Sequence, residues 1–269
     1  MTEWSNNWKL KFHPSKCKTM RMGNESDQSA YYLDNHPLDQ IDSEKDLGIT
    51  VDNKLKFEDH VNNIVNKANK MMGLVRRSFD YLDKPMFTKL FKSLVRPHLE
   101  YASTTWFPTT VKMKNLVENV QRRATKRVNG MREMEYEERL RSLNLPCLLY
   151  RKIRGDMIET YKMCNNMYDE GLPLPIKPST NTLTSRSTHR LTKTKFNKNV
   201  RKYFFKNRIV NLWNRLPNAV KDSQTTNTFK NRLDDLWKNL DIMYNFTKCM
   251  DFTEQHMNLD YAGSVEINY

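Results

Sequence analysis

The sequence is poor in glycine and has only four cysteines, and both shortages narrow the class of protein. Seven glycines in 269 residues are too few for a Gly-rich sandwich or an elaborate phosphate-binding scaffold. Cys17, Cys147, Cys164 and Cys249 form no Cys-x-x-Cys pair, so we expect neither a disulfide framework nor a zinc knuckle. The six histidines are also scattered and are interpreted as structural. These absences favour a protein of a reduced, intracellular compartment.

Long apolar runs and the common catalytic motifs are absent as well. No apolar run approaches the roughly 20 residues of a membrane helix, and the start, MTEWSNNWKLKF, has no signal-peptide core. We therefore expect a protein of the nucleus or cytoplasm, neither secreted nor membrane-bound. G-x-S-x-G, P-loop and G-x-G-x-x-G motifs are missing, and nothing supports nucleophilic catalysis or a small-molecule substrate. Asp234 and Asp235 are adjacent in a helical pattern, where neighbours diverge by about 100°, so no metal site is expected there.

Positive charge is what the sequence has in excess, and it is unevenly placed. The net charge is +14 in total, with −3 over residues 1–60, +10 over 61–160, +10 over 161–215 and −3 over 216–269. Clustered lysine and arginine neutralise phosphates and release counterions. A basic middle between acidic ends therefore favours nucleic acid as the partner over a merely basic soluble protein.

Hydrophobic periodicity predicts a mainly α chain, a helical bundle with a small N-terminal β/α part. Short strands are expected near residues 31–33 and 48–51, and a 3.6-residue period begins at Phe57. The Pro-, Ser-, Thr- and Lys-rich segment after Gly171 is typical of a linker or a loop that orders on binding. The predicted parts are residues 1–56, a helical bundle at 57–168, a basic linker at 169–200, a helical hairpin at 201–240, and a tail at 241–269 whose weak periodicity leaves disorder open.

Two predicted helices carry cations beside an apolar stripe. The first spans about residues 61–79 and ends near Arg76 and Arg77. Asp83 and Pro85 then signal the start of a helix, which Pro97 should end or kink. Another helix is expected from residue 111 to 129, with Gly130 as its C-cap. On a helical wheel its apolar residues occupy one face, and the opposite face carries Arg122, Arg123, Lys126 and Arg127. That face is either simply solvated or contacts phosphates.

Aromatic residues at helical spacing are expected near the C-terminus. The predicted helices at about residues 201–216 and 229–240 carry Phe204, Trp213 and Trp237 among their apolar positions. Such residues form cores far more often than platforms for stacked bases. We therefore predict that they are buried.

Six sequence blocks stand in a fixed order over about residues 4–240, nearly nine-tenths of the chain. They are WKLKFHPSKCKTMRMG, KDLGITVDNKLKFEDHV, LVRPHLEYASTTWFP, VENVQRRATKRVNG, YEERLRSLNLPCLLYRKIRGDMIETYKM, and FFKNRIVNLWNRLP with FKNRLDDLW. Together they resemble the reverse transcriptase of LINE-type (non-LTR, jockey-like) retrotransposons. The resemblance is to the part of that RNA-directed DNA polymerase, a nucleotidyltransferase, that follows its catalytic centre.

The resemblance implies a role for each block. The family's catalytic aspartates, which hold Mg²⁺ in the intact enzyme, precede the first block, so this chain is expected to carry no catalytic residue and no cofactor of its own. Lys16 would lie near the phosphates of the incoming nucleotide and could act as an acid there. Where the family usually has Asn, this chain has His13. Residues 45–52 resemble the primer grip, a tight hairpin in which Gly48 permits close approach of the backbone, while Leu47 and Ile49 would set the hairpin against the palm. The following helices resemble the thumb.

The function expected from this resemblance is to grip primer–template nucleic acid without catalysis. The candidate nucleic-acid-binding residues are Lys16, Lys18, Leu47, Gly48, Arg76, Arg77, Arg122, Arg123, Lys126 and Arg127. Arg96, His98 and Glu100 are interpreted as mostly structural. Two alternatives stay open: a domesticated module that binds another nucleic acid or a protein, and a genomic relic without a role.

Overall fold

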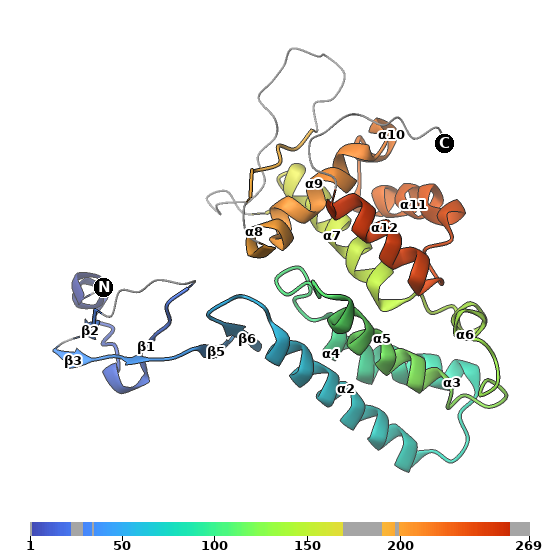
Figure 1. Ribbon diagram of the computed structural model, residues 1–269, viewed down its shortest axis with the longest axis horizontal. Helices are drawn as coiled ribbons and strands as arrows, with labels where there is room; N and C mark the ends of the chain where they lie inside the picture. The colour runs from blue at the N-terminus through green and yellow to red at the C-terminus, as the bar shows by residue number, and fades with distance from the viewer. Residues whose placement is uncertain (1, 23–28, 34, 169–189, 197–198, 259–269) are drawn as a thin grey trace. The chain divides into compact units, whose positions relative to one another are not determined.

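The computed structural model shows two compact units, Met1–Asn62 and Asn63–Tyr269. Most described residues are helical (Figure 1), which confirms the prediction of a mainly α chain. The first unit contains the small strands. The division between the units falls inside the long helix α2, Glu58–Ser78. The residues that the structure describes are 2–22, 29–33, 35–168, 190–196 and 199–258.

The first unit is built from very short elements. Its strands pair two by two: β1 with β4 in parallel, β2 with β3 and β5 with β6 antiparallel. Two-stranded sheets bury little apolar surface and are marginal alone. The elements are α1 (Thr2–Trp8), η1 (Pro14–Lys16), β1 (Lys18–Thr19), β2 (Tyr32–Leu33), β3 (His36–Pro37), β4 (Asp39–Gln40), β5 (Ser43–Asp46) and β6 (Ile49–Asp52).

The β5–β6 hairpin is the most regular strand pair of this unit. Its two-residue turn consists of Leu47 and Gly48, both with positive φ (44° and 86°), as a type I′ turn requires. Asp52 then organises the exit, because its carboxylate accepts hydrogen bonds from the backbone N–H groups of Lys54, Lys56 and Phe57 at 2.7–3.1 Å. The hairpin predicted from residues 45–52 is therefore present, and its turn includes Gly48.

The second unit is helical, and α7 lies at its centre. Helix α7 packs against α5, α9, α11 and α12. These contacts join the predicted bundle and the predicted C-terminal hairpin into one unit rather than two. The elements after α2 are α3 (Lys84–Leu90), η2 (Phe91–Val95), α4 (Arg96–Glu100), α5 (Val111–Thr125), α6 (Tyr136–Leu143), α7 (Leu148–Cys164), α8 (Asn199–Tyr203), α9 (Phe205–Arg215), α10 (Asn218–Lys221), α11 (Thr226–Trp237), η3 (Lys238–Leu240) and α12 (Phe246–Asn258).

Helix α3 begins where the sequence predicts. The Asp83 carboxylate accepts a hydrogen bond from the N–H of Met86 at 2.8 Å, and Pro85 occupies the first turn. The helix continues through a π-helical turn, η2, in which the N–H of Arg96 bonds to the carbonyl of Phe91. Pro97 follows in the first turn of α4. The wider turn thus precedes the residue whose missing N–H was expected to end or kink the helix.

The aromatic residues of the C-terminal helices form the core, as predicted. Trp213 and Phe229 are fully buried. The rings of Tyr161 and Phe229 stack with centroids 4.4 Å apart, and Trp213 lies 6.0 Å from Phe229. These residues join α7, α9 and α11, so they stabilise the unit and are not open to nucleic-acid bases. Phe204 differs, because its side chain is exposed.

The segment after residue 240 corrects the expectation of a loose tail. Helix α12 packs against α7 and α9, its Cys249 is fully buried, and Phe252 meets Trp237 edge to face at 6.0 Å. The periodicity is weak because polar residues occupy much of α12, although Phe246 and Cys249 are buried and Phe252 is half-buried. Residues 259–269 of the predicted tail lie outside the described residues.

Two further boundaries differ from the sequence expectations. Helix α5 ends at Thr125, four residues before the predicted end, and turns lead on to Gly130 at φ 76°. Within the predicted linker, Leu191 is buried, and its N–H and carbonyl both bond to the amide of Asn214 at 2.9 Å. This part of the linker is docked on α9, while residues 169–189 and 197–198 lie outside the described residues.

Candidate nucleic-acid interface

An open groove of about 460 Å³ separates α2 from α5 in the second unit, where the two helices lie side by side (Figure 1). Helix α2 contributes residues spaced i, i+3, i+4 and i+7, which share one helical face, and α5 contributes Val120, Arg123 and Ala124, followed by Arg127 in the turn after it. The small residues Gly73 and Ala124 occupy corresponding places on the two sides. The groove is lined by Asn69, Met72, Gly73, Arg76, Phe79, Asp80, Leu82, Val120, Arg123, Ala124 and Arg127.

Three of the predicted cations, Arg76, Arg123 and Arg127, line this groove. Arg123 donates to the amide oxygen of Asn69 across the groove at 3.3 Å. Arg77 lies beside it, since its Nη1 is 3.6 Å from the position a Cβ would take on Gly73. We call Arg76, Arg77, Arg123 and Arg127 the groove arginines. The structure therefore brings together residues almost fifty positions apart in the sequence.

The groove arginines differ from other arginines of this unit in their partners. Within the described part of the chain, none of the four has a carboxylate oxygen within 4.0 Å. By contrast, Arg154 grips Asp234 with two nitrogens at 2.6 and 2.7 Å, and Arg151 pairs with Glu100. Asp80 is the carboxylate among the described lining residues. The groove thus presents guanidinium groups whose charge is available to an anion.

Arg122 and Lys126 do not line the groove, although the helical wheel placed them on the same face. Arg122 donates to Asn119 at 3.2 Å and lies over the rings of Tyr136 and Phe246, 4.9 and 5.8 Å from their centroids. Lys126 is exposed at the C-cap of α5. The wheel arc was about 140° wide, so its two edges face different surroundings.

The remaining candidates belong to the first unit. Lys16 is exposed at the end of η1, and Lys18 forms an exposed ion pair with Glu44 at 3.2 Å. Ile49 is buried, but Leu47, which was expected to pack inward beside it, is 83% exposed because it occupies the turn of the hairpin. Leucine rarely adopts positive φ, because its Cβ then crowds the backbone. The tip of the hairpin therefore combines backbone strain with an outward-facing apolar side chain.

A second hollow, about 420 Å³, lies next to η1 in the first unit. It is lined by His13, Pro14, Ser15, Cys17, His36, Pro37 and Asp39. The Ser15 hydroxyl and Nδ1 of His13 are 2.8 Å apart, so His13 is held by a local hydrogen bond. Over the described residues, no group of three or more His, Cys, Asp or Glu is placed to hold a metal ion.

Several charged residues of the basic middle of the chain, which was taken to favour a nucleic-acid partner, are instead buried. Arg208 holds Asp156 with two nitrogens at 2.8 and 3.0 Å, and both side chains are almost fully buried. Lys152 donates to the carbonyl of Leu99 at 2.8 Å and lies 3.9 Å from the ring centroid of Trp106. Burial lowers the pKa of Lys152 to about 7. These charges hold the core together and contribute nothing to the groove.

Glu118 is a further buried carboxylate that the sequence did not reveal. It accepts hydrogen bonds from the Tyr136 hydroxyl at 2.6 Å and from the N–H of Leu148 at 2.9 Å. Burial raises the pKa of Glu118 to about 7, although both hydrogen bonds oppose this shift. Its place on α5 next to the start of α7 lets it cap that helix from a distance in the sequence.

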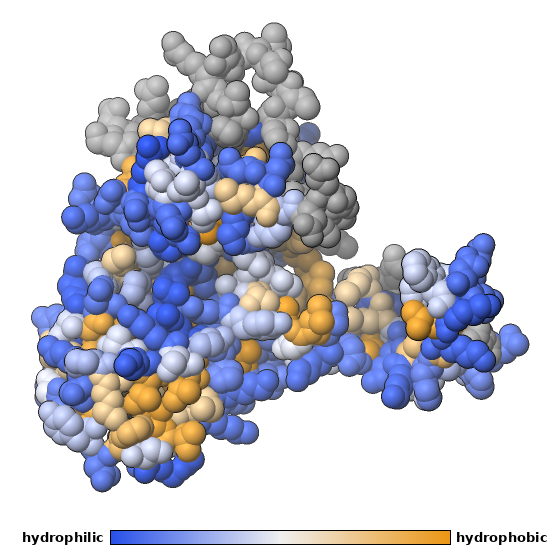
Figure 2. Space-filling model, turned by 180° about the vertical axis from the view of Figure 1, so that it is seen from behind, coloured by the Kyte–Doolittle hydropathy of each residue, from blue (hydrophilic) through white to orange (hydrophobic). Residues whose placement is uncertain are grey.

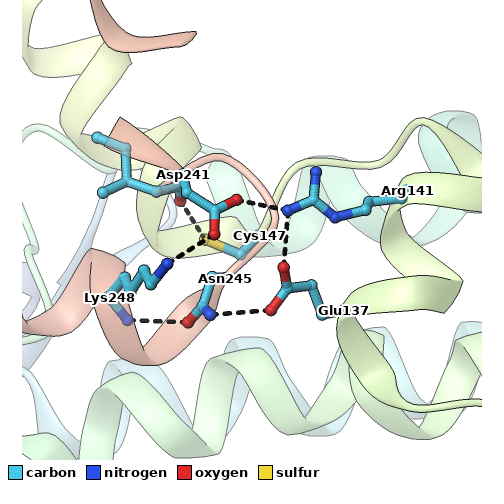
Figure 3. A network of polar contacts seen from close by, with 7 residues as sticks. Glu137, Arg141, Cys147, Asp241, Asn245 and Lys248 are labelled. Carbon is cyan, nitrogen blue, oxygen red and sulfur yellow. Dashed lines mark hydrogen bonds and ion pairs between the residues drawn. The ribbon is translucent and has the colours of Figure 1, made fainter. Parts of the chain in front are cut away.

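A polar network joins α6 to the segment before α12 (Figure 3). Arg141 bonds to Glu137 at 2.7 Å and also to Asp241, whose other oxygen accepts from Lys248 at 2.8 Å. The side-chain amide of Asn245 donates a hydrogen bond to Glu137. Its oxygen accepts one from the N–H of Lys248, so Asn245 caps the start of α12. These contacts orient α12 and so fix the part of the unit that the sequence left loosest.

Comparisons with known proteins add little. No family model matches the chain, and no solved structure matches it. An uncharacterized protein of Caenorhabditis elegans, B0403.1, is 28% identical over 120 residues, which make up 43% of this chain. The chain spans 60% of the length of that relative. In the described ranges, no helix has the length and apolar character needed to cross a membrane.

Proposed function

We propose that this chain grips the phosphate backbone of nucleic acid in the groove between α2 and α5. The observation that carries the proposal is the set of groove arginines, which are close together and have no carboxylate partner among the described residues. Guanidinium groups bind phosphate oxygens in pairs and read no base sequence. A groove with small side chains on both sides suits a backbone that must pass close to two helices.

We further propose that this grip is the thumb-like part of a LINE-type reverse transcriptase, acting on primer–template duplex. The six ordered sequence blocks support this reading, and the β5–β6 hairpin has the tight turn that the primer-grip resemblance requires. The chain alone then transfers no nucleotide and works in the nucleus or cytoplasm. Incubation with Mg²⁺, nucleotides and any primer–template should give no extension. Template-dependent incorporation would contradict this part of the proposal.

The groove is tested by removing its charges and measuring salt dependence. The triple variant R76Q/R123Q/R127Q should weaken binding to a primer–template duplex and lower the slope of log Kd against log[salt] by about 2 to 3, since each lost phosphate contact removes roughly 0.7–0.9. The matched control K89Q/R132Q/K238Q removes three exposed charges outside the groove. Equal losses in both triples would assign binding to net charge and not to the groove.

One observation favours the alternative of a protein-binding module. Figure 2 shows apolar side chains gathered at the lower end of the second unit, in the region of α3. Leu74 on α2 and Leu94 on η2 are 46% and 36% exposed. A protein partner on this surface would bind with little dependence on salt. A flat salt response of the parent chain would therefore favour this alternative over the groove.

A further inference from the structure

Three aromatic side chains cluster at the start of the first unit. Trp4 and Trp8 lie one turn apart on α1, with ring centroids 6.3 Å apart, and Phe12 lies 5.9 Å from Trp4. Trp4 is 49% exposed and Trp8 66% exposed, while Phe12 is half-buried. We call these three residues the aromatic platform. Its rings support one another and still present large surfaces to solvent.

The chain around the platform is pinned by a local hydrogen-bond pair. The N–H of Leu10 donates to the carbonyl of Ser5 at 3.1 Å, and the Ser5 hydroxyl donates back to the carbonyl of Leu10 at 2.5 Å. Lys9 reverses the chain at φ 55°. This closed turn brings Phe12 back against Trp4. The rings are therefore held in place before any ligand arrives, which lowers the entropy lost on binding.

Positive charge is interleaved with these rings. From Trp4 to Asn24 the sequence contains five cations and no acid. Of the cations, Lys18 is paired with Glu44 and Arg21 lies 6.0 Å from the ring centroid of Tyr31. Lys9, Lys11 and Lys16 are exposed. A polyanion that also carries flat apolar surfaces complements this arrangement better than a purely apolar partner does.

We propose that the aromatic platform stacks the unpaired bases of single-stranded nucleic acid, while the neighbouring lysines contact its phosphates. Stacking on aromatic side chains tolerates any base, because every base has a π-face, and cationic grooves follow the backbone. This is a second site beyond the proposed grip. It belongs to the first unit and the groove to the second, so each can be removed while the other is kept.

The tryptophan distribution gives this proposal a direct readout. Trp106, Trp213 and Trp237 are buried, which leaves Trp4 and Trp8 as the exposed indoles. Titration of the full chain with a 12-nucleotide oligo(dA) should quench the exposed fraction of the fluorescence. An abasic strand of the same length and charge should bind more weakly and quench nothing. Equal affinity for the two strands would overturn the proposal.

Variants separate stacking from folding effects and from the groove. W4A/W8A should weaken oligo(dA) binding about tenfold, whereas W4F/W8F keeps the stacking faces and should bind within about twofold of the parent, as measured by anisotropy of labelled DNA. Unchanged affinity in W4A/W8A would overturn the proposal. Loss of the Trp4 and Trp8 fluorescence when only the protein concentration is raised would also overturn it, because a second copy of the chain would then cover the platform. R76Q/R123Q/R127Q should retain the quenching, so a failure of the groove is distinguished from a failure of the platform.

Discussion

The two units bury their apolar side chains very differently. In the first, Leu33, Ile49 and Val61 are buried, whereas Trp8 and Leu47 are exposed. In the second, long amphipathic helices enclose fully buried aromatic residues around α7. Burial of apolar area is the main stabilising contribution in folding. Most of the folding stability therefore resides in the second unit, whereas the first unit exposes aromatic and basic side chains on a small scaffold.

The largest effect is expected from Trp213→Ala in the second unit. The side chain is fully buried between α9 and α11, and truncating such a residue costs roughly 3–5 kcal/mol of unfolding free energy. Thermal or urea denaturation measures it. Phe204→Ala is the matched control, because Phe204 is 55% exposed and should change stability by about 0.5 kcal/mol at most. If the parent chain melts without a cooperative transition, the second unit has no stable core, and the alternative of a genomic relic without a role is favoured.

A pH-dependent effect is expected from Lys152 in the same core. Because its pKa is lowered to about 7 from 10.5, the folded state binds fewer protons than the unfolded state between these values. The penalty for burying the charge is present below pH 7 and is relieved as the pH rises toward 10.5, by about 5 kcal/mol at most. Lys152→Met should remove this rise in stability, as followed by urea unfolding at several pH values.

The exposed lysine Lys112 supplies the control for this experiment. Lys112→Met on α5 should leave the parent's dependence on pH in place, since surface substitutions usually change stability by less than about 0.5 kcal/mol. If Lys152→Met keeps the parental slope, Lys152 is not the group that titrates. The core of the second unit would then be more hydrated than its burial indicates.

The smallest effect is expected at the hairpin tip of the first unit. Leu47→Asn should stabilise the β5–β6 hairpin by about 1 kcal/mol, because asparagine adopts positive φ more readily and Asn-Gly is the preferred type I′ pair. Gly48→Ala should act in the opposite direction, since Gly48 has φ 86°. Amide hydrogen exchange of β6 measures both. Equal protection in the two variants would show that the turn does not limit the stability of this unit.

The helices could be predicted from the sequence because their determinants are local. The apolar stripe of α2 and the Asp83 cap of α3 lie within a few residues of the structure they specify. The hairpin at residues 45–52 was instead expected from the resemblance, which did not give the position of its turn at Leu47 and Gly48. All four groove arginines were also among the sequence candidates, because Arg76, Arg77 and Arg123 lie on predicted helices and Arg127 follows α5 by two residues. Periodicity specifies which residues share one face of a helix.

Other features depend on partners far away in the sequence. Arg208 and Asp156 are 52 residues apart, and Lys152 and Leu99 are 53 apart. No local pattern distinguishes these buried charges from those that face solvent. The surroundings of Arg122 could not be read from its own helix for the same reason, because Phe246 of α12 comes from beyond the predicted helices. A sequence lists the charges, and only long-range packing decides which of them are available.

The position of α12 has a consequence for biosynthesis. Ribosomes release a chain from its N-terminus onward, and a domain folds as a unit once its parts have emerged. Because Phe246 and Cys249 are buried and α12 packs on α7 and α9, the centre of the second unit stays open until this helix has been synthesised. A nascent chain halted before residue 246 would expose α7 to chaperones, even though most of its helices had already been made.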